Sequence, residues 1–330
     1  MKIFFYYSGF LGTGSVLAGT NRMIFVVAKE LAKDNDVTIC GQRVEKTEVI
    51  GRLKIIKYEC RDVIELIDGH DVLVISGNEE KMFIPVLEKQ KIIRWQHCWL
   101  GDWGNAKMFE PSNVVIAVSN KHLENLCIAG VERNKIRVAY NCVDDSVFYQ
   151  RNSVERNQRS VMYCGALTKN KGLHVLLDAI EMMTEEIVLN IYGNSSMVHA
   201  DNSYESKMLA RASKNIVFHG AVSQEELAIA YSSNSILCVP TFNESFGLVS
   251  VEAQSCGCIP VAHDVGGISE TMDNLVSGFL YHPNTPISIA DAISKAIYGA
   301  KRMRGAAMSF AKKFTKKNTI KMFTDVLSEL

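Results

Sequence analysis

The sequence is poor in features that mark membrane, metal-binding and disulfide-rich proteins. No apolar run reaches the roughly 18 residues of a membrane span, and residues 1–7 are apolar but too short for a signal peptide, with no convincing cleavage site after them. The nine cysteines are odd in number, scattered and never spaced as Cys-x-x-Cys. We therefore interpret them as core residues in a reducing compartment, and expect a cytoplasmic protein.

An excess of one charge is also lacking. Lys plus Arg and Asp plus Glu both number 36, so the net charge gives no reason to expect a nucleic-acid partner. One local exception is Lys295 to Lys321, which contains nine Lys or Arg and no Asp or Glu. The default interpretation is the solvated face of terminal helices, and the alternative is docking on an anionic membrane surface.

The first half of the chain alternates short apolar runs with helical patterns. A helix is expected over Arg22–Lys33, where apolar residues recur at helical spacing. The expected buried strands are Ile3–Tyr7, Val37–Cys40, Lys54–Tyr58, Val72–Ser76, Ile92–Trp95 and Val114–Val118. Such alternation predicts an α/β fold, with a parallel sheet covered by helices on both faces.

A second set of the same kind follows a polar stretch, Gln150 to Ser160, which we interpret as a linker. Its expected strands are Val161–Cys164, Ile187–Tyr192, Ile216–His219, Ser235–Val239, Ile259–Ala262 and Phe279–Tyr281. The chain length suits two domains of about 150 residues each. We expect Rossmann-like domains at 1–150 and 151–314, a last helix near 315–330 crossing back to the first, and a ligand cleft where the strand ends face each other.

Two motifs near the N-terminus, one glycine-rich and one acidic, are only weak indications of a binding site. Gly12-x-Gly14 precedes a helix and allows close approach of a phosphate, but Leu17 stands where a dinucleotide fingerprint has its third glycine. The next strand ends in Cys40-Gly41 without the acidic residue that holds a ribose, which argues against a nicotinamide site. Asp34-Asn35-Asp36 links a helix to a strand and is interpreted as a solvated turn.

The informative stretch runs from Pro240 to Glu270, where a strand leads through a short loop into a helix beginning near Gly247. The free N–H groups of that helix start suit a diphosphate. Glu244 and Glu252 would lie on the order of 10 Å apart at a rise of roughly 1.5 Å per residue. They would then hold a sugar and a ribose at opposite ends of an extended ligand. The alternative is that Glu244 caps the helix and Glu252 is solvated.

This stretch resembles the retaining glycosyltransferases of family 4, which have the two-domain GT-B fold. The family's Glu-x7-Glu signature corresponds to Glu244-Ser245-Phe246-Gly247-Leu248 followed by Glu252-Ala253. The resemblance extends through Gly257-Cys258-Ile259-Pro260-Val261 and Gly266-Gly267-Ile268-Ser269-Glu270. Upstream it covers Asn141-Cys142-Val143-Asp144, Gly165 to Gly172, the strand ends Tyr192-Gly193 and His219-Gly220, Gly19 with Arg22, and Trp95-Gln96-His97.

The resemblance implies a role for each matching residue. Lys171 would neutralise the donor diphosphate, Glu244 would hold the transferred sugar and Glu252 the ribose. His97 would approach the sugar from the first domain, unless it is simply a hydrogen-bonded histidine at a strand end. The remaining donor-binding residues would be Gly14, Gly19, Gly165, Lys169, Tyr192, Gly193, Gly220, Ser245, Phe246, Gly247, Leu248 and Val249.

Two residues depart from the family pattern. Ala166 stands where the family has a diphosphate-binding Arg, which removes one donor of a bidentate clamp. Either another cation such as Lys169 supplies that charge, or donor affinity is lower. Cys142 replaces a Gly in the segment between the domains, where it would stiffen the hinge.

The expected function is therefore a retaining, metal-independent glycosyltransferase without a cofactor. Its donor would be a nucleoside-diphosphate sugar, a UDP-sugar in preference to a GDP-sugar. The acceptor would be a glycan or a lipid-linked sugar in cell-surface glycan synthesis, which membrane docking through Lys295–Lys321 would suit. The alternatives are a nucleotide-sugar epimerase of the same fold and a non-catalytic subunit that binds nucleotide sugars.

Overall fold

A computed structural model describes residues 1–7, 19–41, 47–57, 63–76, 89–100, 106–184, 186–195 and 202–330. The chain divides into two compact units, and each is described by itself. Unit 1 comprises residues 1–142 and 316–330, and unit 2 comprises residues 143–315.

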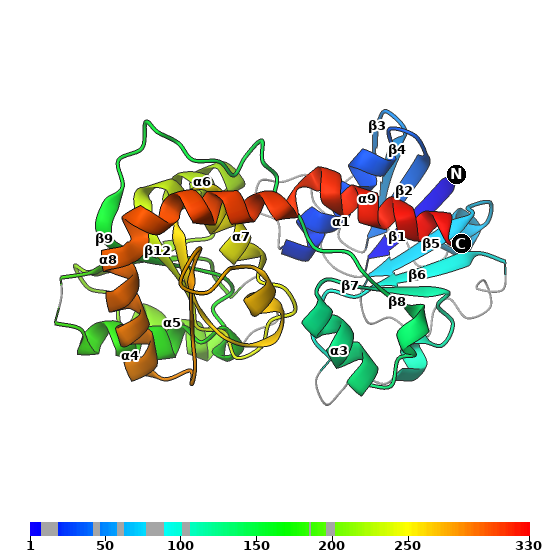
Figure 1. The fold of residues 1–330 in the computed structure, drawn as a ribbon. Helices are drawn as coiled ribbons and strands as arrows, with labels where there is room; N and C mark the ends of the chain where they lie inside the picture. The colour runs from blue at the N-terminus through cyan, green and yellow to red at the C-terminus, as the bar shows by residue number, and fades with distance from the viewer. Residues whose placement is uncertain are drawn as a thin grey trace. The chain divides into compact units, whose positions relative to one another are not determined.

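Unit 1 is built on an eight-stranded sheet of order β3-β4-β2-β1-β5-β6-β7-β8 (Figure 1). Every neighbouring pair is parallel except β3 with β4. The strands are β1 (Lys2–Tyr7), β2 (Asp36–Gly41), β3 (Glu48–Ile50), β4 (Leu53–Lys57), β5 (Val72–Ser76), β6 (Lys91–Trp95), β7 (Val114–Ala117) and β8 (Ile136–Val138). Its helices are α1 (Gly19–Leu31), α2 (Val63–Ile67), α3 (Asn120–Ile128), α9 (Lys316–Ser328) and the short 3-10 turns η1 (Ala106–Phe109) and η2 (Arg133–Lys135).

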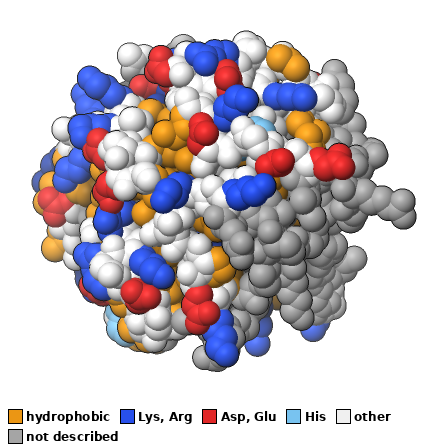
Figure 2. Space-filling model, turned by 90° about the vertical axis from the view of Figure 1, so that its right-hand side faces the viewer, with side chains coloured by type: hydrophobic (Ala, Val, Ile, Leu, Met, Phe, Trp, Pro, Cys, Tyr) orange, Lys and Arg blue, Asp and Glu red, His pale blue; other side chains and the backbone are white. Residues whose placement is uncertain are grey.

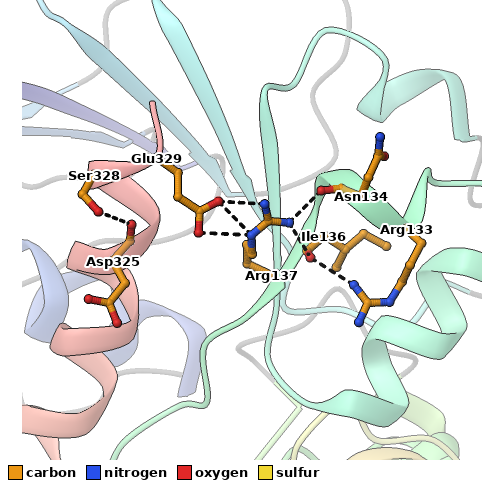
Figure 3. A network of polar contacts seen from close by, with 7 residues as sticks. All are labelled: Arg133, Asn134, Ile136, Arg137, Asp325, Ser328 and Glu329. Carbon is orange, nitrogen blue, oxygen red and sulfur yellow. Dashed lines mark hydrogen bonds and ion pairs between the residues drawn. The ribbon is translucent and has the colours of Figure 1, made fainter.

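The C-terminal helix α9 completes unit 1. Its Phe323 is fully buried and packs against Phe5 and Trp95, with ring centroids 6.1 and 5.2 Å away. Its end is fixed by an ion pair in which Arg137 Nη2 lies 2.7 Å from Glu329 Oε2 (Figure 3). Residues far apart in sequence therefore share one core.

Unit 2 is built on a fully parallel six-stranded sheet of order β11-β10-β9-β12-β13-β14, of which Figure 1 labels β9 and β12. The strands are β9 (Asn157–Cys164), β10 (Val188–Tyr192), β11 (Ile216–Gly220), β12 (Asn234–Val239), β13 (Ile259–His263) and β14 (Phe279–Tyr281). The helices are α4 (Leu173–Met182), α5 (Asn202–Leu209), α6 (Gln224–Ser233), α7 (Leu248–Ser255), α8 (Pro286–Ala311) and the 3-10 turns η3 (Lys169–Lys171), η4 (Gly266–Glu270) and η5 (Lys312–Phe314).

The central strands are continuous apolar runs because both of their faces are covered. All residues of β5, β7, β12 and β13 are buried, which is the pattern of a parallel sheet between helices. The α/β class and the two parallel-sheet domains predicted from sequence are confirmed. Asp34 and Asn35 lie in the predicted turn between α1 and β2, and Asp36 begins β2 and pairs with Arg52 at 2.9 Å.

The boundary between the units lies before the expected position, residue 150. Val143 donates a backbone hydrogen bond to Phe314 O at 2.9 Å, and Phe148 packs edge-on against Tyr231. Residues 143–150 therefore belong to unit 2. The expected linker was wrong at its other end as well, because Asn157–Ser160 already belong to β9.

The distribution of surface charge and the character of the helices agree with what the composition predicts. On the face drawn in Figure 2, Lys and Arg side chains are interspersed with Asp and Glu. None of the helices in the described parts of the chain combines the length and apolar character that crossing a membrane requires.

Candidate active site

The loops at the carboxyl ends of β9 and β12 form the centre of the candidate site in unit 2. From β9 the sheet continues through β10 and β11 on one side, and through β12 to β14 on the other. The chain order therefore reverses between β9 and β12. In open α/β sheets, ligands bind beside the carboxyl ends of the strands at such a switch point.

Two predicted site residues meet there. Lys171 ends the loop after β9 and Glu244 lies in the loop after β12, and Lys171 Nζ is 2.8 Å from Glu244 Oε2. Their side chains are 33% and 19% exposed, so solvent and a ligand can reach both. Solvent that reaches an ion pair screens and weakens it, so a bound anion can replace Glu244 as the partner of Lys171.

Hydrogen bonds fix the loop that carries Glu244. Four of its carbonyl and amide groups have partners outside the loop: Phe242 N–H donates to Asn170 O (2.9 Å), His263 Nδ1 to Thr241 O (2.9 Å), Asn284 Nδ2 to Pro240 O (2.8 Å) and Gly267 N–H to Glu244 O (2.9 Å). Asn170 directly precedes Lys171, so its carbonyl joins the two loops. The positions of Lys171 and Glu244 are therefore set by backbone as well as by their own pairing.

The start of α7 presents amide groups beside Glu244. Gly247 is the N-cap, with φ +97°, a value that favours glycine. Leu248 and Val249 begin the helix and are half-buried, and the first N–H groups of a helix have no partner within it. Together with the helix dipole they provide a site for an anion.

Ser245 and Phe246 lie beneath this start and are buried. Phe246 is 1% exposed, and its ring packs edge-on against Phe314 at 5.4 Å between centroids. Its side chain therefore supports the loop, and any donor contact from Phe246 would come from its backbone.

Glu252 lies on the next turns of α7 and is not solvated. It is 1% exposed, and Tyr231 of α6, which is also fully buried, donates a hydrogen bond to Glu252 Oε2 at 3.3 Å. A carboxylate buried to this extent needs such donors, because burial without them is costly. The interpretation of Glu252 as a surface group of a helix is wrong.

Glycines allow close packing of the loops after β9 and β10. Gly193 has φ +126°, and a Cβ there would lie 2.0 Å from Gly165 O. No residue other than glycine fits at this position. Next to it, the rings of Tyr192 and His219 stack in parallel, with centroids 4.4 Å apart and an interplanar angle of 6°. This pair and Gly220 mark the ends of β10 and β11.

Ala166 and Lys169 lie in the loop after β9, near Lys171. Ala166 is half-buried, and its carbonyl accepts a hydrogen bond from Tyr163 Oη at 2.9 Å. Lys169 is exposed at the start of η3, so its charge is available on the same loop. The described residues contain no cluster of His, Cys, Asp or Glu that could hold a metal ion.

The predicted residues of unit 1 are only partly described. Gly19 begins α1, whereas Gly14 lies outside the described residues. His97 follows β6 and is 9% exposed, with its ring 4.6 Å from that of Trp95. Burial, with a smaller contribution from nearby His122, lowers the pKa of His97 to about 3. The imidazole is therefore neutral at physiological pH.

The sequence did not indicate Asn170, Tyr231 or His263. Asn170 and His263 act on backbone groups, which no side-chain motif reveals. Tyr231 lies in an apolar stretch, and its only signal is that a buried tyrosine usually has a hydrogen-bond partner. The partner is 21 residues away and could not be identified from spacing.

The fold and this site define a two-domain glycosyltransferase. A family model described as "Glycosyl transferases group 1" matches residues 146–313, just over half of the chain and nearly all of unit 2. The chain belongs to this family of glycosyltransferases, which argues against the epimerase and the non-catalytic alternatives.

Similar proteins include both uncharacterised and solved members. An "Uncharacterized 41.2 kDa protein in cps region" of Klebsiella pneumoniae is 27% identical, over 83% of this chain and 80% of the relative. A D-inositol 3-phosphate glycosyltransferase of Xylanimonas cellulosilytica is 27% identical, over 58% of this chain and 50% of the relative. The structure of Anabaena HepE in complex with UDP-glucose covers both chains completely, with a TM-score of 0.82 and 17% identity, which shows a common fold.

Proposed function

We propose that the chain is a family 4 glycosyltransferase that transfers a sugar from a nucleoside-diphosphate sugar to an acceptor hydroxyl with retention, without a metal ion. The observation that carries this proposal is the pairing of Lys171 with Glu244 beside the start of α7. A cation, a sugar-binding carboxylate and the amides of a helix start are what a diphosphate sugar requires.

In this proposal each group acts on a different part of the donor. The diphosphate replaces Glu244 as the ion-pair partner of Lys171, and it accepts hydrogen bonds from the backbone N–H groups of Leu248 and Val249. Glu244 then accepts hydrogen bonds from hydroxyls of the transferred sugar. Glu252 is assigned to the ribose hydroxyls, and because it is 1% exposed, this assignment requires its carboxylate to become accessible when the donor binds. Donor specificity for the base would depend on the strand ends that carry Tyr192 and His219.

Transfer breaks the bond between the anomeric carbon and the phosphate oxygen, and forms one from that carbon to the acceptor oxygen. The electron pair leaves with the nucleoside diphosphate, whose new charge Lys171 and the amides stabilise. The leaving phosphate takes the proton of the acceptor hydroxyl on the same face of the sugar. Neutral His97 would approach the sugar as a hydrogen-bonding group.

We propose a UDP-sugar as donor and a cell-surface glycan as product, made in the cytoplasm. Support comes from the complexes of HepE with UDP and UDP-glucose. The relative from the Klebsiella cps region and the fold shared with a lipopolysaccharide outer core galactosyltransferase, TM-score 0.73 and 16% identity, support the product class.

Anionic membrane docking through Lys295–Lys321 is part of the same proposal. Lys301 and Arg302 are exposed on α8, and Lys312 and Lys313 are exposed on η5 directly after it. Lys295 and Lys321 instead pair with Asp291 and Asp325. Equal co-sedimentation with neutral and with phosphatidylserine-containing vesicles would exclude docking.

A thermal-shift screen with UDP, GDP, ADP, dTDP and CMP tests donor binding. We expect UDP to raise Tm by mass action, equally with and without EDTA. Lys171→Met should abolish the shift. Lys295→Met, which removes an exposed paired lysine of α8, is the matched control and should preserve it. Absence of a shift with every nucleotide would contradict the proposal.

A further inference from the structure

Phe242 is an exposed aromatic residue in the loop that carries Glu244. Phe242 is 45% exposed, whereas Thr241 directly before it is 1% exposed and Ser245, three residues after it, is 8% exposed. A single exposed apolar residue is ordinary on a protein surface. Phe242 differs because its position and its ring orientation are both fixed.

Two contacts hold Phe242 in place. Its backbone N–H donates to Asn170 O, and its ring stacks on the imidazole of His174 with centroids 6.0 Å apart and an interplanar angle of 17°. His174 is held in turn by Tyr204, whose hydroxyl lies 3.0 Å from His174 Nδ1. The Phe242 ring thus lies nearly parallel to an imidazole whose own position Tyr204 fixes, while 45% of Phe242 remains exposed.

Polar residues lie next to Phe242 in its own loop and in the loop that its N–H contacts. Lys169 and Asn170 are exposed on the loop after β9, and half-buried Asn243 directly follows Phe242. A flat apolar ring with donors and acceptors beside it matches a pyranose, which has C–H bonds on one face and hydroxyls at its edge. A lipid chain would instead require a continuous apolar patch.

We propose that Phe242, supported by His174, stacks against a pyranose ring of the acceptor. The inference rests on the proposed function, because there Glu244 is assigned to the transferred sugar. Phe242 lies two residues earlier in the same loop, so it extends the site beyond the donor. The acceptor would accordingly end in a sugar.

Saturation-transfer NMR with methyl α- and β-glycopyranosides of glucose, galactose and mannose tests this stacking on the full chain, with and without UDP. We expect at least one glycoside to bind, with saturation strongest at the protons of one ring face. Phe242→Ala should raise the Kd of that glycoside about tenfold, and Phe242→Tyr should retain binding. Tyr298→Ala removes an exposed aromatic ring of α8 and should have no effect.

Failure to bind any of these glycosides, or equal binding by Phe242→Ala, would overturn the inference. If Phe242→Ala weakened binding of UDP-glucose but not of UDP, the ring would contact the transferred sugar instead of the acceptor, which would also overturn it. Failure of the wild-type protein to bind UDP would refute the proposed donor site. That outcome is distinguishable, because the glycosides are also measured without UDP.

Discussion

At the scale of single residues, the candidate site depends on charges that are already paired. Lys171 and Glu244 lie 2.8 Å apart, and in the proposed function both have a different partner when the donor is bound. The donor must then offset only a weak ion pair, because both side chains are partly exposed. A buried pair would resist this exchange.

Ala166 allows a residue-scale test of the diphosphate site. Ala166→Arg should tighten UDP binding about tenfold, because a charged donor adds a charge-assisted hydrogen bond to phosphate. Ala166→Gln has a long side chain without the charge and is the control. Isothermal titration calorimetry measures both, and weaker or unchanged binding by Ala166→Arg would mean that the diphosphate lies elsewhere.

The family resemblance predicted which residues act on one ligand, but it did not predict how deeply they are buried. The resemblance brought Lys171 and Glu244 to one ligand, and the structure places them in contact. It did not predict that Glu252 would be 1% exposed and bonded to Tyr231. Burial of a charged residue depends on long-range packing, which local sequence does not report.

At the scale of elements, the start of α7 is the feature that a substitution can test most sharply. Gly247→Ala should lower stability by about 1–2 kcal/mol, because φ +97° disfavours a side chain and the new Cβ would meet Ile268 Cγ1 at 3.0 Å. It should also weaken UDP binding by displacing the amides of Leu248 and Val249.

Gly305→Ala is the matched control for this substitution. Gly305 lies within α8, and a Cβ there meets no atom within 4 Å. The change should raise stability by about 0.5–1 kcal/mol and leave UDP binding unaltered. Urea unfolding and calorimetry measure the two effects. Gly247→Ala with wild-type stability and affinity would show that the helix start is not the anion site.

The bounds of a strand could be predicted from the sequence where its apolar run covers the same residues as its backbone hydrogen bonds to a neighbouring strand. β5 and β14 have the predicted bounds, because the predicted runs Val72–Ser76 and Phe279–Tyr281 are also the residues that pair with a neighbouring strand. β3 and β8 were missed, being three-residue strands at the sheet edges with few buried side chains. The start of β9 was missed because Asn157 pairs with Asn234 through the backbone, while the side chains of Asn157 to Arg159 remain exposed.

At the scale of the whole molecule, the sequence predicted two parallel-sheet domains but not where one ends. Polar composition placed the boundary near Gln150, whereas the hydrogen bond from Val143 to Phe314 joins the preceding segment to unit 2. Contacts between distant segments determine such a boundary, and composition does not record them. His97 and Glu244 belong to different units.

The most direct test of the central claim is the rate of nucleoside-diphosphate release from the nucleotide sugar selected by the binding screen. With EDTA present, the wild-type protein should hydrolyse this donor slowly, and Lys295→Met should match it. Lys171→Met and Glu244→Gln should each reduce the rate by about 10²-fold, the loss typical of removing one stabilising group from a preorganised site. Equal rates in all four proteins, or activity that EDTA abolishes, would contradict the account.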